Sequence, residues 1–144
     1  LLVFLAVACN KADTNFIQLP NAAQRVTPAD IGESWLVNDT RVMASTEIAE
    51  SRSERRRGLL GRDDLDGALV LRPCRWVHTV GMRFPLDVAY LDRDGVVIKT
   101  ARMQRHRVGV PVLTARTIIE ARAGAFARWG LRVGDHIEIR DDDR

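Results

Sequence analysis

The chain has 144 residues, of which 46% are hydrophobic and 28% are charged, and its formal net charge is +3. This size and composition suit one globular domain and exclude an intrinsically disordered chain. The positive charge is accompanied by no recognised nucleic-acid-binding motif and no interleaved aromatic residues, so we expect no nucleic-acid partner.

The first residues differ in character from the rest. Leu1 to Ala8 is a continuous apolar run, too short to cross a bilayer, and Cys9 follows it. We interpret residues 1–9 as a candidate remnant of a signal or lipoprotein sequence, in which Cys9 would carry the lipid. The favoured prediction is therefore an exported, envelope-anchored protein with a membrane tether through Cys9. The alternative is a cytoplasmic protein to which upstream sequence has been wrongly joined.

The rest of the chain divides into a linker, a domain and a tail. Residues 10–34 are interpreted as linker, because they include Pro20 and Pro28 and show no sustained periodicity. Residues 35–140 are predicted to form a single domain, and residues 141–144 an acidic tail. The domain itself is expected to consist mainly of short strands.

Two strands and a helix are predicted first. Residues 35–37 and 41–43 flank Asn38-Asp39, a turn pair that tolerates positive φ, and residues 45–49 continue as a strand. A capping box, Ser51-x-x-Glu54, then predicts a short helix that ends near Leu60-Gly61. Gly58 within that helix indicates either close packing against a neighbouring backbone or a break in the helix.

The second half of the domain is also rich in strand patterns. Asp94-Gly95 predicts a hairpin, and alternation of apolar and polar residues marks a half-buried last strand. The predicted elements are strands at 68–71, 87–91, 96–103, 117–121 and 137–139, and one or two helical turns at 123–129. Together they predict a mainly β fold, either a β-sandwich or a barrel-like sheet, with two short helices.

Residues 76–92 are the most informative stretch and read Trp-Val-His-Thr-Val-Gly-Met-Arg-Phe-Pro-Leu-Asp-Val-Ala-Tyr-Leu-Asp. They resemble the signature of the bacterial and archaeal family known as domain of unknown function 192, specifically the branch that carries His-Thr-x-x-Met-x-Phe-Pro-Leu-Asp. Further matches are Arg55-x-x-Gly58-Leu59-Leu60-x-Arg62, Glu120-x-x-x-Gly124 and Gly134-Asp135. The resemblance covers about residues 35–140. It implies a compact jelly-roll-like β fold and, because the family has no settled activity, no particular function.

Five polar residues are the candidates for a ligand-binding site: Arg62, His78, Thr79, Asp87 and Glu120. The simpler interpretation of Asp87 is a turn-capping or arginine-paired carboxylate that holds a loop. Likewise, His78 and Thr79 would bond loop backbone. Alternatively, Asp87, Arg62 and His78 line a polar pocket, which Glu120, on an otherwise apolar strand, would join. Trp76 and Met82 are expected in the core, or in the wall of a ligand site if they are exposed.

Neither a metal nor a cofactor is expected. The spacing Cys74-x-x-x-His78-x-x-x-Met82 resembles a copper-binding loop. Such a site also needs a second histidine well upstream of the loop, whereas the other histidines here, His106 and His136, both lie downstream. The scattered histidines do not have the spacing of a zinc site. No nucleophile motif, phosphate-binding loop or dinucleotide-binding glycine pattern is present either.

Positive charge is concentrated in one part of the chain. No acidic residue occurs from Gly95 to Ile119, whereas basic residues occur throughout it: Lys99, Arg102, Arg105, Arg107 and Arg116. This segment is either a solvated face or a patch that attracts anions.

The leading functional hypothesis is a non-catalytic small-ligand or accessory binding module with a polar cleft, whose partner is a small molecule or an anion. The first alternative is a small hydrolase or isomerase that uses His78 as base and Asp87 as its orienting partner. A purely structural or protein-interaction domain, with an apolar surface patch, is the second. The sequence does not indicate an oligomeric state.

Overall fold

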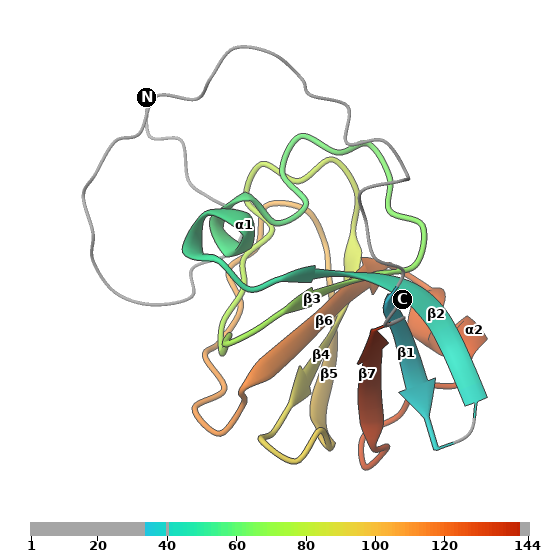
Figure 1. The fold of residues 1–144 in the computed structure, drawn as a ribbon. Helices are drawn as coiled ribbons and strands as arrows, with labels where there is room; N and C mark the ends of the chain where they lie inside the picture. Colours follow the sequence, from blue (N-terminus) through green and yellow to red (C-terminus); the bar gives the residue numbers. More distant parts are fainter. Residues whose placement is uncertain (1–33, 40, 142–144) are drawn as a thin grey trace.

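In the computed structural model, residues 34–39 and 41–141 are described, and they form one seven-stranded sheet with two short helices (Figure 1). The elements are β1 (Ser34–Asn38), β2 (Arg41–Ala49), α1 (Arg52–Arg57), β3 (Ala68–Leu71), β4 (Leu86–Leu91), β5 (Val97–Met103), β6 (Thr117–Arg122), α2 (Ala125–Trp129) and β7 (Ile137–Asp141). The predicted mainly β fold with two short helices is confirmed, in its barrel-like form. The predictions for residues 1–33, including Cys9, and for residues 142–144 lie outside the described residues, while Ser34 and Asp141, predicted as linker and tail, belong to β1 and β7.

The sheet curls until its two edge strands meet at one end. Its strand order is β5-β4-β6-β3-β2-β1-β7, and β2 and β3 are the neighbours that run parallel. Two contacts join the edges of the sheet: Val96 forms an isolated β-bridge with His136, and the N–H of Ile137 donates to the carbonyl oxygen of Gly95 at 2.9 Å. Gly95 has a φ of +80°, and a Cβ there would lie 2.8 Å from the Ile137 carbonyl oxygen. A glycine is therefore needed where β5 approaches β7.

Both faces of the sheet are covered, so β4 is buried along its whole length. Leu86, Val88 and Tyr90 pack on one face against residues of the loop between β3 and β4, including Val77, Met82 and Phe84. We call this the loop-side face. Ala89 and Leu91 pack on the other face against Phe126 and Leu131, and we call it the α2-side face. Burial on both faces explains why β4 is a nearly continuous apolar run.

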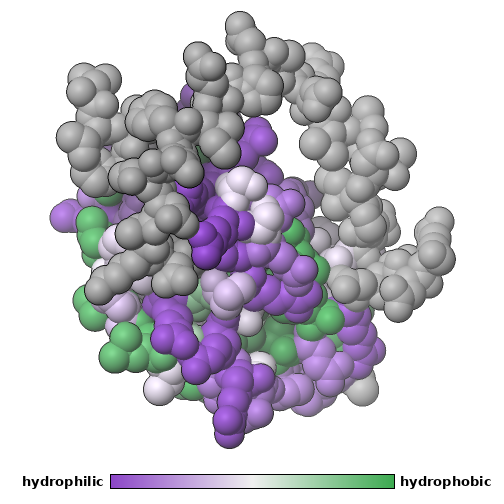
Figure 2. Space-filling model, turned by 60° about the vertical axis from the view of Figure 1, so that its left-hand side comes forward, coloured by the Kyte–Doolittle hydropathy of each residue, from purple (hydrophilic) through white to green (hydrophobic). Residues whose placement is uncertain are grey.

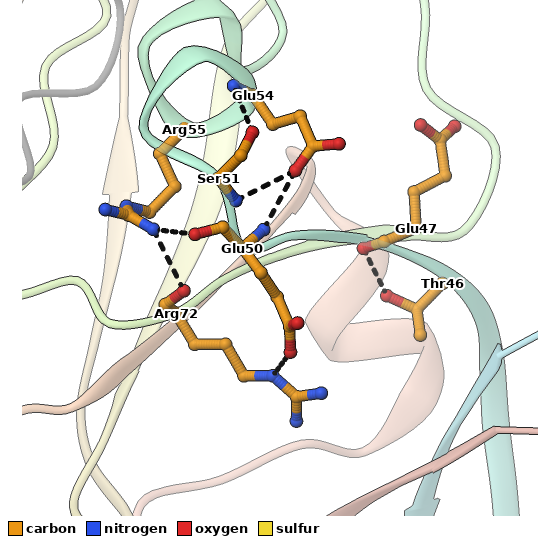
Figure 3. A network of polar contacts seen from close by, with 7 residues as sticks. All are labelled: Thr46, Glu47, Glu50, Ser51, Glu54, Arg55 and Arg72. Atoms are coloured by element: carbon orange, nitrogen blue, oxygen red, sulfur yellow. Dashed lines mark hydrogen bonds and ion pairs between the residues drawn. The ribbon is translucent and has the colours of Figure 1, made fainter.

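Helix α1 begins as predicted but ends earlier. Ser51 Oγ accepts from the N–H of Glu54, and Glu54 Oε2 accepts from the N–H of Ser51, which completes the capping box (Figure 3). The predicted end near Leu60-Gly61 was wrong, because Gly58 has a φ of +46° and caps the helix after Arg57. The alternative interpretation of Gly58 as a break in the helix is the correct one.

A buried arginine joins α1 to the sheet. The guanidinium of Arg55 donates to the carbonyl oxygens of Glu50 and Arg72, at the ends of β2 and β3, as Figure 3 shows. Arg72 Nε in turn donates to Glu50 Oε1 at 2.6 Å. Because Arg55 and Gly58 belong to the same sequence motif, that motif has a structural role here: it fixes where α1 ends and how it packs. Among the residues the structure describes, no helix is long and apolar enough to span a membrane.

Candidate functional site

Asp87 is a buried carboxylate with a complete set of donors. It lies on β4, and its side chain reaches the α2-side face of the sheet. Its Oδ2 accepts hydrogen bonds from the N–H groups of Gly124 at 2.8 Å and Phe126 at 3.2 Å, at the start of α2. Arg102 Nε, on the neighbouring strand β5, donates to Oδ1 at 2.9 Å. Asp87 therefore fixes the position of α2, which agrees with its interpretation as a loop-holding, arginine-paired residue.

His78 and Thr79 bond the backbone of their own surroundings. Both are buried, and the Nδ1 atom of His78 accepts from the N–H of Val80 at 3.3 Å. Burial lowers the pKa of His78, because the charged imidazolium would lose its hydration. Thr79 Oγ1 donates to the carbonyl oxygen of Gln104 at 2.6 Å and accepts from the N–H of Arg107 at 2.9 Å. Thr79 thus holds the segment after β5 against the loop between β3 and β4, while the imidazole of His78 bonds within that loop.

Replacing Thr79 with valine should lower the free energy of unfolding by about 1–2 kcal/mol. Valine keeps the shape of threonine but leaves the Gln104 carbonyl and the Arg107 N–H without their buried partner. Urea unfolding monitored by tryptophan fluorescence measures this loss. Thr79→Ser, which retains the hydroxyl, is the control and should lose less. Equal losses in both variants would mean that the two hydrogen bonds of the hydroxyl contribute no more to stability than the methyl group that serine lacks.

Arg62 forms a bidentate ion pair with Glu47 and no bond with His78, Thr79 or Asp87 among the described residues. Its Nη1 and Nη2 atoms donate to the two carboxylate oxygens of Glu47, on β2, at 2.8 and 2.7 Å. The hydrogen bonds from Arg62 lower the pKa of Glu47, and the same bonds raise the pKa of Arg62. Both side chains are partly exposed. The pair connects β2 to the segment that follows α1.

Glu120 is the most unusual group in the domain. It lies on β6, between Leu69 of β3 and Val88 of β4, on the loop-side face, and it is 1% exposed. Its Oε2 atom has no hydrogen-bond partner among the described residues. Burial raises the pKa of Glu120 to about 8, and burial, together with the nearby Glu120 carboxyl, raises the pKa of Tyr90. At neutral pH the carboxyl is therefore mostly protonated.

These five predicted residues do not form one site through direct bonds. Within residues 34–39 and 41–141, no hydrogen bond or ion pair joins any two of Arg62, His78, Thr79, Asp87 and Glu120. Asp87 and Glu120 face opposite sides of the sheet. The hydrogen bond between His78 and Asp87 that the hydrolase alternative requires is not formed: Asp87 accepts from Arg102, Gly124 and Phe126, and His78 accepts from the N–H of Val80.

A polar cleft lies instead between α2, β2 and the loop before β3. It has a volume of about 260 Å³ and brings together side chains from three distant parts of the chain. Those that carry its chemistry are Ser45, Asp66, Arg122, Arg128 and Trp129. Gly67, also in its lining, allows the loop to approach β2, since a Cβ there would lie 2.3 Å from the Ser45 carbonyl oxygen. The cleft therefore depends on close backbone packing that only glycine permits.

The two arginines that line the cleft differ in whether their side chains have partners. The guanidinium of Arg122 donates to the carboxylate of Asp64, whereas the side chain of Arg128 has no ion pair or hydrogen bond among the described residues. The centroids of the Trp129 indole ring and the Phe126 ring lie 5.8 Å apart, and Phe126 belongs to the core. Asp87 contributes indirectly, since its bonds to Gly124 and Phe126 hold the helix that carries Arg128 and Trp129.

Sequence reasoning missed this cleft. Arg122, Arg128 and Trp129 are ordinary residues at a strand end and in a short amphipathic helix, and nothing in their spacing relates them to Asp66. Trp76 and Met82 were expected in the core, and Met82 is buried there, while Trp76 is half-buried and donates its Nε1–H to the Gly109 carbonyl oxygen at 2.6 Å. In the described part of the chain, no group of three or more potential metal-ligating side chains is found.

Comparison with known proteins identifies a family and a fold. Residues 35–139 match the model of the family DUF192, described as "Uncharacterized ACR". A protein of unknown function from Novosphingobium aromaticivorans has a similar structure, with a TM-score of 0.66, 21% identity, and coverage of 82% of this chain and 94% of its own. A candidate transcription regulator from Sinorhizobium meliloti has a TM-score of 0.61, 19% identity, and coverage of 74% and 92%. No curated protein matches the chain. At these identities the two structures establish the fold alone.

Proposed function

The chain belongs to the DUF192 family, and we propose that its domain is a non-catalytic binding module for a small polar anion. The observation that carries this proposal is the Arg128 guanidinium, which has no ion pair among the described residues and lines a 260 Å³ cleft beside Trp129. An unpaired guanidinium is a strong donor to a carboxylate or phosphate. Among the described residues that line the cleft, none forms a pair suited to acid–base or nucleophilic catalysis, which favours binding over turnover.

The lining of the cleft indicates what kind of anion it would take. Arg128 and Arg122 offer donors to a negative group, Asp66 offers an acceptor to a hydroxyl or ammonium group, and Trp129 offers an apolar wall. The volume lies below the roughly 300–1,000 Å³ of sites for drug-sized ligands. A monosaccharide acid has the required size and combination of groups, so glucuronate is the probe that we choose.

Arg128→Gln should weaken the binding of glucuronate by about 10- to 100-fold, the effect of losing one hydrogen bond to a charged group. Isothermal titration of the full chain with glucuronate measures the change. Glucose, which lacks the carboxylate, should bind weakly to both forms. Sulfate, which lacks the hydroxyl groups, should bind more weakly than glucuronate.

Arg132→Gln is the matched control. Arg132 lies four residues beyond Arg128, carries the same charge and does not line the cleft. Its loss should leave the affinity within about twofold, because screening weakens the effect of a distant exposed charge. Equal losses in the two variants would show that net charge, and not the cleft, controls binding. No binding of any of the three probes would reject the proposal for acidic monosaccharides.

A further inference from the structure

Exposed aliphatic side chains gather in one segment of the surface. Among the described residues, the large hydrophobic side chains that are exposed are Val42, Val108, Val110, Leu113 and Val133. Three of these five lie between positions 108 and 113, and they are 66%, 68% and 74% exposed. Single exposed apolar residues are normal on a protein surface, but a group of them marks a site of interaction.

The same segment is positively charged. It lies within the acid-free stretch from Gly95 to Ile119, and the side chains of Arg105 and Arg107 have no ion pair or hydrogen bond among the described residues. Arg116 follows at its end, and its guanidinium donates to the carbonyl oxygen of Ala115. Figure 2, which brings forward the left-hand side of Figure 1, shows hydrophobic side chains exposed among hydrophilic ones on this face. Apolar and cationic groups are thus presented together.

The backbone of the segment is held in place, so these side chains project from a fixed support. The N–H of Gly109 donates to the carbonyl oxygen of Val77 at 3.0 Å, and the N–H of Thr79 donates to that of Arg107 at 2.7 Å. A third bond, from the N–H of Val112 to the Arg75 carbonyl oxygen, is 2.9 Å long. A fixed support means that little ordering is required on binding.

We infer that this segment, residues 105–116, docks the domain on an anionic lipid surface. Aliphatic side chains beside unpaired cations match the two layers of such a surface, its acyl boundary and its negative headgroups. A groove of about 300 Å³ between the segment and β5 has the same mixed lining, including Met103 and Val110 with Lys99 and Arg107. A protein partner would need a concave surface to enclose projecting side chains, whereas lipid accepts them without a preformed shape.

Sedimentation of the full chain with vesicles tests this inference. The unaltered chain should bind vesicles of equal parts phosphatidylglycerol and phosphatidylcholine, and bind phosphatidylcholine alone at least tenfold more weakly. Replacing Val108, Val110 and Leu113 with serine should reduce the partition coefficient at least tenfold. Replacing Arg105 and Arg107 with glutamine should reduce it by about fivefold for each arginine. All variants keep residues 1–33, so any binding through those residues is the same in each.

Matched controls come from the same chain. Val42→Ser with Val133→Ser removes exposed valines elsewhere, and Arg57→Gln with Arg132→Gln removes two exposed arginines elsewhere. Both controls should bind the vesicles like the unaltered chain. Equal binding by segment and control variants would overturn the inference. So would binding that needs the two arginines but survives loss of the three aliphatic side chains, since a surface for acidic polypeptides behaves in that way and would also bind polyglutamate.

Discussion

The free energy of unfolding should fall by up to about 5 kcal/mol as the pH rises from 4.5 to 8, because Glu120 is protonated in the folded domain. Its pKa is about 8 in the fold against 4.5 for an unperturbed glutamate. Each unit of difference corresponds to about 1.4 kcal/mol. The value is an upper bound, since water penetration and local relaxation reduce the cost of burying a charge.

The sign follows from which state holds the proton. Between the two pKa values, the folded domain keeps the proton on Glu120 while the unfolded chain releases it, so rising pH favours unfolding. Below pH 4.5 both states hold the proton, and the full stability is present. The neighbours Leu69 and Val88 offer no donor to a carboxylate, which explains why ionisation is unfavourable there.

Urea unfolding at a series of pH values from 5 to 8 measures the effect, and Glu120→Gln isolates it. Glutamine has nearly the same shape and does not titrate, so its stability should change less with pH than that of the unaltered chain. Glu120→Leu should be more stable than the unaltered chain at pH 8, because it places an apolar group in apolar surroundings. Parallel pH profiles for the unaltered chain and Glu120→Gln would mean that Glu120 is ionised or solvated in the fold.

Asp87→Ala should lower the free energy of unfolding by about 1–3 kcal/mol. The substitution leaves the N–H groups of Gly124 and Phe126 without their acceptor at the start of α2 and removes the partner of Arg102. Because α2 carries Arg128 and Trp129, the same variant should also weaken glucuronate binding. Denaturant unfolding measures the first effect and calorimetric titration the second.

An exposed aspartate provides the matched control. Asp63 also accepts from an arginine, Arg83, at 2.6 Å, but its side chain is 84% exposed. Asp63→Ala should therefore change stability by well under 1 kcal/mol. Arg102→Gln should cost less than Asp87→Ala, since the two backbone bonds of Asp87 remain. If Asp87→Ala is no more harmful than Asp63→Ala, Asp87 does not hold α2, and its role as a ligand-binding residue becomes the better interpretation.

Elements set by neighbouring residues could be predicted from the sequence. The hairpin around Asp94-Gly95 and the capping box of Ser51 and Glu54 both appear where predicted, because their hydrogen bonds join residues a few positions apart. The buried strands followed from apolar runs, and family likeness agreed with the β fold. The predicted end of α1 near Leu60-Gly61 was wrong because Gly58, with its positive φ, caps the helix three residues before Gly61.

The sequence by itself therefore determined the strands, the turns, the mainly β class and the family, since these depend on local backbone preferences and on the alternation of apolar residues. Only the tertiary structure decided which polar residues meet. The partners of Asp87 lie 15 to 39 positions away, and the cleft joins β2, a loop and α2. The face on which Glu120 lies, and hence its pKa, depended on how β3, β6 and β4 pair. Contacts between distant segments arise from the packing of the whole sheet, and no local spacing in the chain encodes them.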